Sequence, residues 1–386
     1  LVNVKSDGSF RLDMKYFSYA TGLTMTNENF SNLFGNPVRN QNSKIEQFHM
    51  DIASSIQNVT EEIVLKICHF IKKKFNQKNL CLAGGVALNC VANGKILREG
   101  KFDNLWIQPA AGDAGGALGA AFATHHIHLK QSRYVNGCDK MRGSYLGPHF
   151  EQDEIEEKLT AVGAKFNVLS DTELFSACAK DLAEEKAVGW FQGRMEFGPR
   201  ALGSRSIIAD PRLEKMQKTL NLKVKYRESF RPFAPSVLRE DLNEWFDFDY
   251  DSPYMLLVCD VKKNIRYELN ETEKKLFGID KLNIKRSKIP AVTHVDYSAR
   301  IQTVHKETNP KYHSLISRFK EITGCPLLVN TSFNVRGEPI VCTPTDAFKC
   351  FMGTQLDALV VGNCFLIKED QKIELIESYK EKYALD

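Results

Sequence analysis

Between residues 58 and 74, apolar side chains recur every three or four positions, and charged side chains occupy much of the rest of the pattern. This is the spacing of one face of an α-helix. The sequence therefore predicts an amphipathic helix over 58–74. Its apolar positions are Val59, Ile63, Val64, Ile67, Phe70 and Ile71.

Two short apolar runs each lead into a turn of small residues, which is followed by another helical pattern. A strand, a glycine turn and a helix repeated at close spacing indicate an α/β domain with its ligand loops at the strand ends. The first unit has a strand at 80–83, a turn at 84–85 and a helix at 86–97, and the second has a strand at 104–108, a turn at 109–116 and a helix at 117–126.

The rest of the chain predicts a second α/β or α+β domain. Residues 129–150 show little periodicity and contain glycine, proline, serine and asparagine, so the boundary is placed there. We expect a first domain at 1–135, a linker at 136–150, a second domain at 151–368 and a charged tail at 369–386 that frays, with a short helical piece at most. The predicted elements of the second domain are helices at 172–185 and 311–324 and strands at 187–191, 291–295 and 327–329.

The composition is that of an ordinary globular protein, with 43% hydrophobic and 26% charged residues among 386. This length predicts two domains and excludes a small disulfide-stapled module. A net charge of +4 provides no broad basic field for nucleic acid or a membrane surface. No apolar run approaches the ~20 residues of a membrane-spanning helix.

The ten cysteines include no C-x-x-C pair, which indicates reduced, mostly buried thiols and favours a cytoplasmic location. The chain begins with Leu1 rather than methionine, in a segment without the layout of a signal peptide. We therefore expect the C-terminal part of a longer protein.

The densest group of basic residues lies between 192 and 206, where three arginines are interleaved with three glycines. Such a loop can bring guanidinium groups and backbone N–H groups to one anion. The alternative is a solvated basic face, which the interleaved Gly, Pro and Phe residues disfavour. The basic residues of this loop and of the segment that follows it are Arg194, Arg200, Arg205, Lys223, Lys225, Arg227 and Arg231.

Residues 330–334 carry the sequence Asn-Thr-Ser-Phe-Asn directly after a strand-like run. Polar side chains at a strand end suit phosphate or amide recognition. The alternative is an Asx or Ser/Thr turn without a ligand. Arg300 adds another possible anion ligand, whereas we expect His294 to be structural.

Two glycine turns open helices in the first domain, at 84–89 and 112–119. Each could hold a phosphate at a helix N-terminus, although neither matches the dinucleotide fingerprint or the P-loop. Asp113 could hold a metal or a nucleotide-bound cation, or could simply cap its helix. His125, His126 and His128 form no spaced ligand pair and are expected to be solvated.

Four of these segments occur together and in order, and together they resemble the O-carbamoyltransferase family typified by NodU and CmcH. They are Leu-Ala-Gly-Gly-Val-Ala-Leu-Asn at 82–89, Pro-Ala-Ala-Gly-Asp-Ala-Gly at 109–115, Gly-Arg-Met-Glu-Phe-Gly-Pro-Arg-Ala-Leu-Gly at 193–203 and Asn-Thr-Ser-Phe-Asn at 330–334. The resemblance extends over residues 45–368.

The resemblance implies an O-carbamoyltransferase that works in two steps from carbamoyl phosphate and ATP. A YrdC-like α/β domain, here 151–368, would form carbamoyl adenylate and pyrophosphate. An ASKHA-type (actin/Hsp70-like) domain, of which 1–135 would be the C-terminal half, would transfer the carbamoyl group to an acceptor hydroxyl. The implied partners are carbamoyl phosphate, ATP and a hydroxylated small molecule or saccharide. No membrane partner is expected, nucleic acid is not favoured, and exposed apolar surface on an incomplete first domain would favour a homo-oligomer.

The resemblance also assigns roles to individual positions. The carbamoyl-phosphate and nucleotide ligands fall on Arg200, Arg205, Lys225, Arg231, Arg300, Asn330 and Ser332. The adenylate-binding loops contain Gly84, Gly85, Asn89, Gly112, Gly115 and Gly116. Asp113 corresponds to an aspartate ligand of a divalent metal, iron in the better-known members, and Mg²⁺ would accompany ATP. The family's H-x-x-x-H metal-binding pair occurs nowhere in this sequence.

Two other functions stay open. One is an enzyme of the tRNA threonylcarbamoyl-adenosine type, which the weak overall basicity disfavours. The other is a non-catalytic nucleotide-binding module. The sequence does not identify the acceptor.

Overall fold

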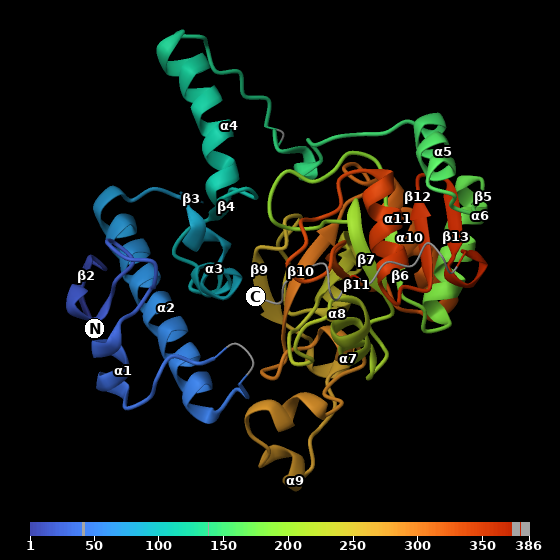
Figure 1. Cartoon of the computed structure of the whole chain (residues 1–386). Coiled ribbons are helices and arrows are strands. Elements are labelled where there is room, and N and C mark those ends of the chain that lie inside the picture. The colour runs from blue at the N-terminus through green and yellow to red at the C-terminus, as the bar shows by residue number, and fades with distance from the viewer. Residues whose placement is uncertain (41–42, 138, 373–378, 380–386) are drawn as a thin grey trace. The chain divides into compact units, whose positions relative to one another are not determined.

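The computed structural model describes residues 1–40, 43–137, 139–372 and 379. They form a mixed α/β protein, which confirms the predicted class (Figure 1). The chain divides into two compact units, Leu1–Cys81 with Val91–Trp106 and Leu82–Cys90 with Ile107–Asp386. This division differs from the predicted domains, because both glycine turns fall in the second unit. Most of the predicted tail, 369–386, lies outside the described residues.

The first unit is built around a long helix, α2, which contains the predicted helix 58–74. A capping box between Glu46 and His49 precedes it, Asn76 in the left-handed conformation ends it, and lysines in its last turn favour the helix dipole. The buried Glu61 on α2 pairs with Lys95 on the next helix. The elements in this part of the chain are β1 (Val2–Val4), β2 (Phe10–Leu12), α1 (Glu28–Phe34), α2 (Gln47–Phe75), β3 (Asn79–Leu82), α3 (Cys90–Arg98) and β4 (Asn104–Ile107).

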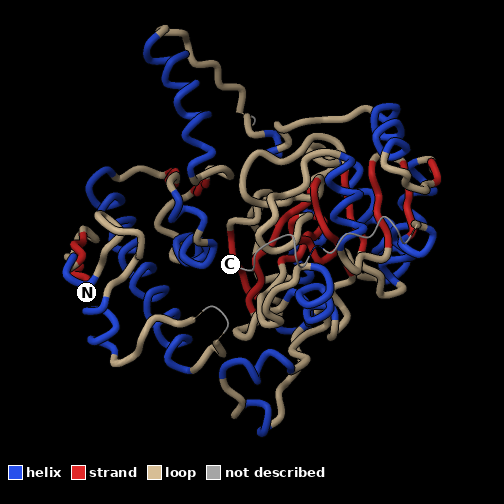
Figure 2. Tube along the Cα trace, in the orientation of Figure 1, coloured by secondary structure: helices blue, strands red, loops and turns tan. Residues whose placement is uncertain are grey.

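The second unit contains one nine-stranded mixed sheet with the order β5-β13-β12-β6-β7-β11-β8-β10-β9. Figure 2 draws the strands in red and the helices in blue. Only the β10–β8 and β12–β6 pairs are parallel among the pairings described. The strands are β5 (Asn167–Val168), β6 (Val188–Phe191), β7 (Arg205–Ala209), β8 (Ala234–Leu238), β9 (Leu257–Asp260), β10 (Ser298–Val304), β11 (Leu327–Ser332), β12 (Ala358–Val361) and β13 (Cys364–Ile367).

Helices α6 and α10 pack against each other and against the sheet, and α11 packs against β6, β12 and α5. The interior strands β6, β7, β8 and β12 are buried along their whole length, so both sheet faces are covered there. The helices of this unit are α4 (Asp113–Ala123), α5 (Gln152–Ala161), α6 (Asp171–Ala183), α7 (Met216–Thr219), α8 (Leu242–Trp245), α9 (Glu271–Lys274), α10 (Pro310–Thr323) and α11 (Pro344–Gly353).

Most of the predicted long elements are confirmed, and three local predictions are wrong. The predicted strand 291–295 is largely a 3₁₀ turn, Pro290–Val292, because a proline opens it and the chain reaches β10 only at Ser298. The predicted helix 86–97 begins as a 3₁₀ turn, Gly85–Leu88, and Asn89 then leaves the helical conformation before α3. The second glycine turn ends at Gly112, because α4 already begins at Asp113.

Among the described residues, no helix combines the length and the apolar character that crossing a membrane requires. The cysteines of this part of the chain are all free thiols. Cys138 lies outside it.

Candidate anion-binding site

The arginine-rich loop connects the neighbouring strands β6 and β7 and is folded around a buried carboxylate. One oxygen of Glu196 accepts hydrogen bonds from the backbone N–H groups of Leu202 at 2.6 Å and Ser204 at 2.9 Å. Burial raises the pKa of the Glu196 carboxyl, against the opposing effect of these donors. The ring N–H of Trp190 holds the same loop by donating to the Gly203 carbonyl at 3.0 Å. The loop is therefore a fixed structure.

Two glycines are required for the path of this loop. Gly203 has φ +102°, and a Cβ there would lie 2.2 Å from the Tyr312 ring. Gly198 has φ +136°, and a Cβ there would lie 3.1 Å from the Pro109 carbonyl oxygen. Only glycine adopts such angles without strain. The second contact places the arginine loop directly against the second glycine turn.

Arg205 supports this loop from inside. Its side chain is fully buried, and its NH1 donates to the carbonyl oxygens of Gln192 at 3.0 Å and Gly193 at 3.2 Å. Its NH2 donates to the Pro148 carbonyl at 3.3 Å, and its guanidinium stacks 3.5 Å from the centre of the Phe191 ring. Burial lowers its pKa to about 10, so it stays charged at neutral pH. The geometry gives Arg205 a positioning role.

Arg200, Arg227 and Arg300, which we call the cation cluster, have a different environment. The side chains of Arg200 and Arg300 make no hydrogen bond or ion pair within the described ranges, and the Nε of Arg200 is buried without a partner. Burial and the nearby Arg300 lower the pKa of Arg200 to about 10. Burial, Arg231 and Arg300 do the same for Arg227, despite a raising effect of Glu228. Like charges held together with donors to spare are typical of an anion site.

A carboxylate lies at the edge of the cation cluster. Glu228 accepts from Arg231 Nε at 3.0 Å and from Arg336 NH1 at 3.2 Å. Burial would raise the pKa of Glu228, but a backbone hydrogen bond and these two arginines hold it below its ordinary value. Glu228 is therefore a charged carboxylate that neutralises part of the positive field.

Replacing Glu228 with glutamine is expected to tighten sulfate binding by about threefold to fivefold, the size of a partly exposed ion pair. Removing the negative charge releases Arg231 from its ion pair with Glu228 and removes a repulsion of the anion. Calorimetric titration with sulfate measures the effect, and Glu321→Gln, on an exposed carboxylate paired with Arg318 at 2.6 Å, is the matched control. Weaker binding by Glu228→Gln would show instead that Glu228 orients the arginines for the ligand.

Lys225 is buried beside the end of β11. Its Nζ contacts four acceptors, namely the carbonyl and hydroxyl oxygens of Ser332 at 2.8 and 3.1 Å and the carbonyl and amide oxygens of Asn334 at 2.8 and 2.6 Å. Burial and the neighbouring Arg227 lower the pKa of Lys225 to about 7. Lys225 therefore fixes the loop after β11 and loses its charge near neutral pH.

Sulfate binding at pH 7.5 is expected to take up a substantial fraction of a proton. The pKa of Lys225, about 7 without a ligand, lies below that pH, and a bound anion nearby raises it. Uptake should vanish at pH 5.5, where the lysine is already charged. Titrations in buffers of different ionisation enthalpy measure the uptake, and sulfate itself does not titrate in this range. Equal heats in all buffers at pH 7.5 would contradict a titrating Lys225.

Asn330 also positions its neighbours, because its side-chain amide bonds to groups of the chain itself. Its Nδ2 donates to the Ala201 carbonyl at 3.1 Å, to Ser236 Oγ at 3.0 Å and to Gln302 Oε1 at 2.8 Å. Because Ala201 follows Arg200 directly, Asn330 fixes the backbone that carries that arginine. Asn330 lies inside β11, whereas the sequence predicted a strand that ended before it.

The structure adds four residues to the site that had no ligand role in the family resemblance. They are Arg227, Glu228, Asn334 and Arg336. In the sequence, Arg227 lies two positions after Lys225, and Asn334 lies two positions after Ser332. This spacing is the sequence signal that identifies Arg227 and Asn334 as candidates. Glu228 and Arg336 bond to each other from segments that are far apart in the sequence, so their spacing does not predict the contact.

The two glycine turns lie side by side. The N–H of Gly84, which has φ +94°, donates to the Ala111 carbonyl at 2.9 Å. Gly85 and Asn89 continue the first turn, and Gly112 precedes α4. In the first turn of α4, a Cβ on Gly115 would lie 2.1 Å from the Ala110 carbonyl oxygen.

Gly115→Ala is expected to destabilise the chain by about 2 kcal/mol or more, because the new methyl group meets fixed backbone. Gly116 is the matched control in the same turn, since nothing lies within 4 Å of the corresponding position. Gly116→Ala should instead stabilise by about 0.5–1 kcal/mol, as alanine does in a helix. Denaturant unfolding of both variants measures the difference. Equal stabilities would contradict the close approach of Gly115 to Ala110.

The described residues do not fit a metal centre at Asp113. This aspartate is exposed at the start of α4, and no group of three or more His, Cys, Asp or Glu side chains within the described ranges could hold a metal ion. His125, His126 and His128 are exposed or half-buried at the end of α4. Asp113 lies in the first turn of α4, where its charge favours the helix dipole, and its role as a metal ligand stays a prediction of the resemblance.

The structure thus describes an α/β protein in which three neighbouring arginines form a cation cluster. Two family models match the chain, Carbamoyltransferase N-terminus at residues 1–122 and Carbamoyltransferase C-terminus at residues 179–368. The chain belongs to the carbamoyltransferase family, which confirms the resemblance found in its motifs.

Relatives of this chain include characterised and uncharacterised proteins. An uncharacterized protein of Synechocystis is 58% identical over all of this chain and 63% of its own length. The nodulation protein NolNO of Sinorhizobium fredii is 41% identical over 86% of this chain and 46% of its own length. The 3'-hydroxymethylcephem-O-carbamoyltransferase of Streptomyces clavuligerus is 29% identical over 83% and 55%. The chain thus spans about half to two thirds of the length of these relatives.

Proposed function

We propose that this chain makes carbamoyl adenylate from carbamoyl phosphate and ATP. The carbamoyl group is then transferred to a hydroxyl of a sugar or secondary metabolite. The observation that carries the proposal is the cation cluster, in which two of three neighbouring arginines have no partner among the described side chains. The family membership supports carbamoyl chemistry, and the name of the cephem relative supports an acceptor hydroxyl.

The proposed reaction places negative charge on phosphate oxygens and needs no protein nucleophile. Water takes the phosphoryl group of carbamoyl phosphate, which leaves carbamate and inorganic phosphate. A carbamate oxygen then attacks the α-phosphorus of ATP, and pyrophosphate leaves. Fixed arginines that face the phosphates stabilise the charge in both steps.

In this proposal the polar residues divide into two groups. Arg200, Arg227 and Arg300 contact the phosphates, and Arg231 joins them when the ligand competes with Glu228. The remaining predicted ligands hold this arrangement in place, since their donors, apart from the buried Nε of Arg205, are already engaged by the chain: Arg205, Lys225, Asn330 and Ser332. ATP is expected with Mg²⁺ as its counterion.

We further propose that 151–368 is a YrdC-like domain and that 1–135 is the C-terminal half of an ASKHA-type domain, joined by 136–150. The two glycine turns would then hold the adenylate. Their contact with each other and with the loop of Gly198 supports a location near the cation cluster. The proposed transfer step lies outside what the described residues can perform alone.

Exchange of labelled pyrophosphate into ATP tests the proposal. The 386-residue chain should catalyse exchange only when carbamoyl phosphate or carbamate is present. Exchange that requires threonine and bicarbonate instead would favour an enzyme of the tRNA threonylcarbamoyl-adenosine type. A folded chain that binds ATP without exchange under either condition would favour a non-catalytic nucleotide-binding module.

A further inference from the structure

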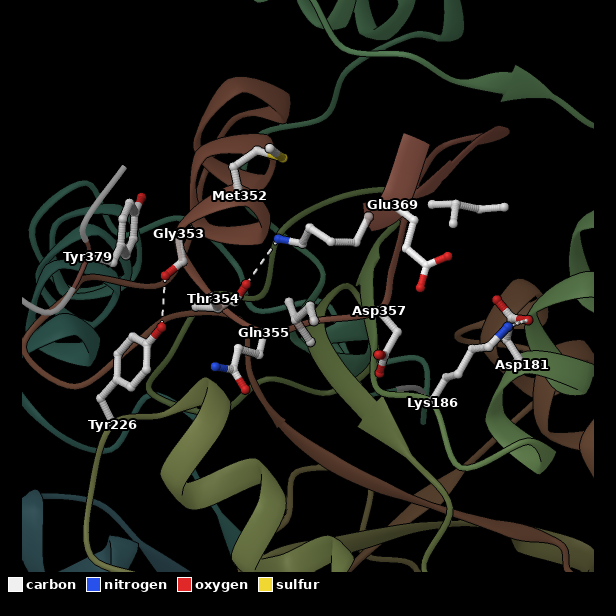
Figure 3. Close-up of a pocket in the computed structure, with 13 residues that line it drawn as sticks. Asp181, Lys186, Tyr226, Met352, Gly353, Thr354, Gln355, Asp357, Glu369 and Tyr379 are labelled. Atoms are coloured by element: carbon white, nitrogen blue, oxygen red, sulfur yellow. Dashed lines mark hydrogen bonds and ion pairs between the residues drawn. The ribbon is translucent and has the colours of Figure 1, made fainter. Parts of the chain in front are cut away.

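The proposed reaction does not use a pocket that is lined by Tyr226, the chain neighbour of Arg227. Its volume is 720 Å³, and we call it the α11 pocket because the end of α11 forms one wall (Figure 3). Figure 3 shows two tyrosines and the end of α11 on one side and three carboxylates with Lys186 on the other. Its lining residues are Asp181, Lys186, Tyr226, Met352, Gly353, Thr354, Gln355, Leu356, Asp357, Ile367, Lys368, Glu369 and Tyr379.

Both ammonium groups of the α11 pocket are engaged by the protein itself, which leaves the amide of Gln355 as a donor. Lys186 Nζ pairs with Asp181 at 2.7 Å and with Glu184 at 3.4 Å. Lys368 Nζ donates to the Phe351 and Thr354 carbonyls at the end of α11, the latter at 3.0 Å. The hydroxyl of Thr354 donates to the Cys350 carbonyl at 2.8 Å. A ligand therefore finds few free donors.

Acceptors, in contrast, remain free. One oxygen of Asp357 accepts the Ala187 N–H at 2.8 Å, which leaves the other available. The Glu369 carboxylate has no hydrogen bond or ion pair to any described side chain. The opposite wall is apolar and aromatic, with Met352, Leu356 and Tyr379. A ligand that fits this wall is a hydrogen-bond donor with a positive charge and an apolar body.

Tyr226 connects the α11 pocket to the cation cluster. Its hydroxyl donates to the Gly353 carbonyl at 2.9 Å, while its neighbours in the chain are Lys225 and Arg227. Its φ of +48° is a left-handed conformation that a bulky residue adopts only under constraint. A ligand that displaces the Tyr226 ring would therefore move the backbone that carries both cations.

We propose that the α11 pocket is a second ligand site, for a small organic amine with an apolar body, and that its occupancy changes the anion affinity of the cation cluster through Tyr226. The coupling rests on the proposed anion site, whereas the amine site stands without it. An amine bound in this pocket would act as an effector that changes the positions of Lys225 and Arg227.

The amine site is tested with 2-phenylethylamine against 2-phenylethanol, which has the same shape without the charge. Saturation-transfer NMR on the 386-residue chain should show the amine binding about tenfold more tightly, a difference of about 1.4 kcal/mol. The preference should disappear in the double variant Asp357→Asn/Glu369→Gln, which keeps the shape of the pocket. Equal binding of the two probes, no binding of either, or an unchanged preference in the variant would overturn the site.

The coupling is tested by titrating sulfate with and without saturating 2-phenylethylamine. Sulfate affinity should change by about fivefold, the lower end of the usual coupling between sites. Tyr226→Ala removes the ring that a ligand would displace, so most of this change should be lost at an amine concentration that saturates the variant. No change in the wild type, or the full change in Tyr226→Ala, would overturn the role of Tyr226. Absence of sulfate binding would overturn the anion site and the coupling, while the amine titration still decides the pocket.

Discussion

Replacing Arg200 with alanine is expected to slow carbamoyl-phosphate-dependent exchange of pyrophosphate into ATP by about 10²- to 10³-fold, the usual cost of one preorganised charge donor. Its guanidinium is partly buried, lies near Arg300 and has no partner among the described side chains. The protein therefore keeps a desolvated charge that contributes nothing to folding. In the proposed function, a phosphate of the ligand is the partner of this charge.

The stability of Arg200→Ala should match or slightly exceed that of the wild type, because a repulsion is removed and no hydrogen bond is lost. Arg194→Ala is the matched control, since Arg194 is an exposed arginine of the same loop that donates only to the Gly147 carbonyl at 3.2 Å. That control should retain its exchange rate. Similar rates for Arg200→Ala and the wild type would contradict a role of Arg200 at the phosphates.

Replacing Arg205 with methionine is expected to lower the free energy of unfolding by about 3 kcal/mol or more. Methionine keeps much of the volume, but the four carbonyl groups of 192, 193, 204 and 148 lose the guanidinium as a donor. The buried Glu196 also loses its nearest positive charge. The loop that carries Arg200 should then loosen, so activity falls together with stability.

Denaturant unfolding of Arg205→Met beside Arg194→Met separates the buried guanidinium from an exposed one. The exposed substitution should change the free energy of unfolding by less than about 0.5 kcal/mol. If Arg205→Met were as stable as Arg194→Met and inactive, Arg205 would be a ligand rather than a support. Arg200→Ala is thus expected to lower activity without lowering stability, whereas Arg205→Met is expected to lower both.

The periodic parts of the fold were predictable from the sequence. Helix α2 contains the apolar spacing of 58–74, and α6 and α10 fall within two residues of their predicted bounds, because a 3.6-residue repeat reports a buried helix face. Strand β6 was predictable as a short apolar run. The start of β10 was not, because the 3₁₀ turn at Pro290–Val292 has the composition of a strand.

The sequence located the basic site but could not divide its residues by role. Arg200 and Arg205 lie five positions apart in one glycine-rich loop, and only the fold reveals that one is engaged by carbonyl groups and the other is not. The family resemblance predicts that Asn330 is a ligand, yet its amide N–H groups donate to Ala201 and Gln302. Residue type reports what a side chain can bind, whereas burial and partners decide what it does bind.

The most direct test of the proposed activity is the release of pyrophosphate when the 386-residue chain is mixed with ATP and carbamoyl phosphate and no acceptor. We predict release that requires both substrates, that stays in the Arg194→Ala variant and that is lost in Arg200→Ala. A folded chain that binds sulfate yet releases no pyrophosphate, or that releases it equally without carbamoyl phosphate, would contradict the formation of carbamoyl adenylate at the cation cluster.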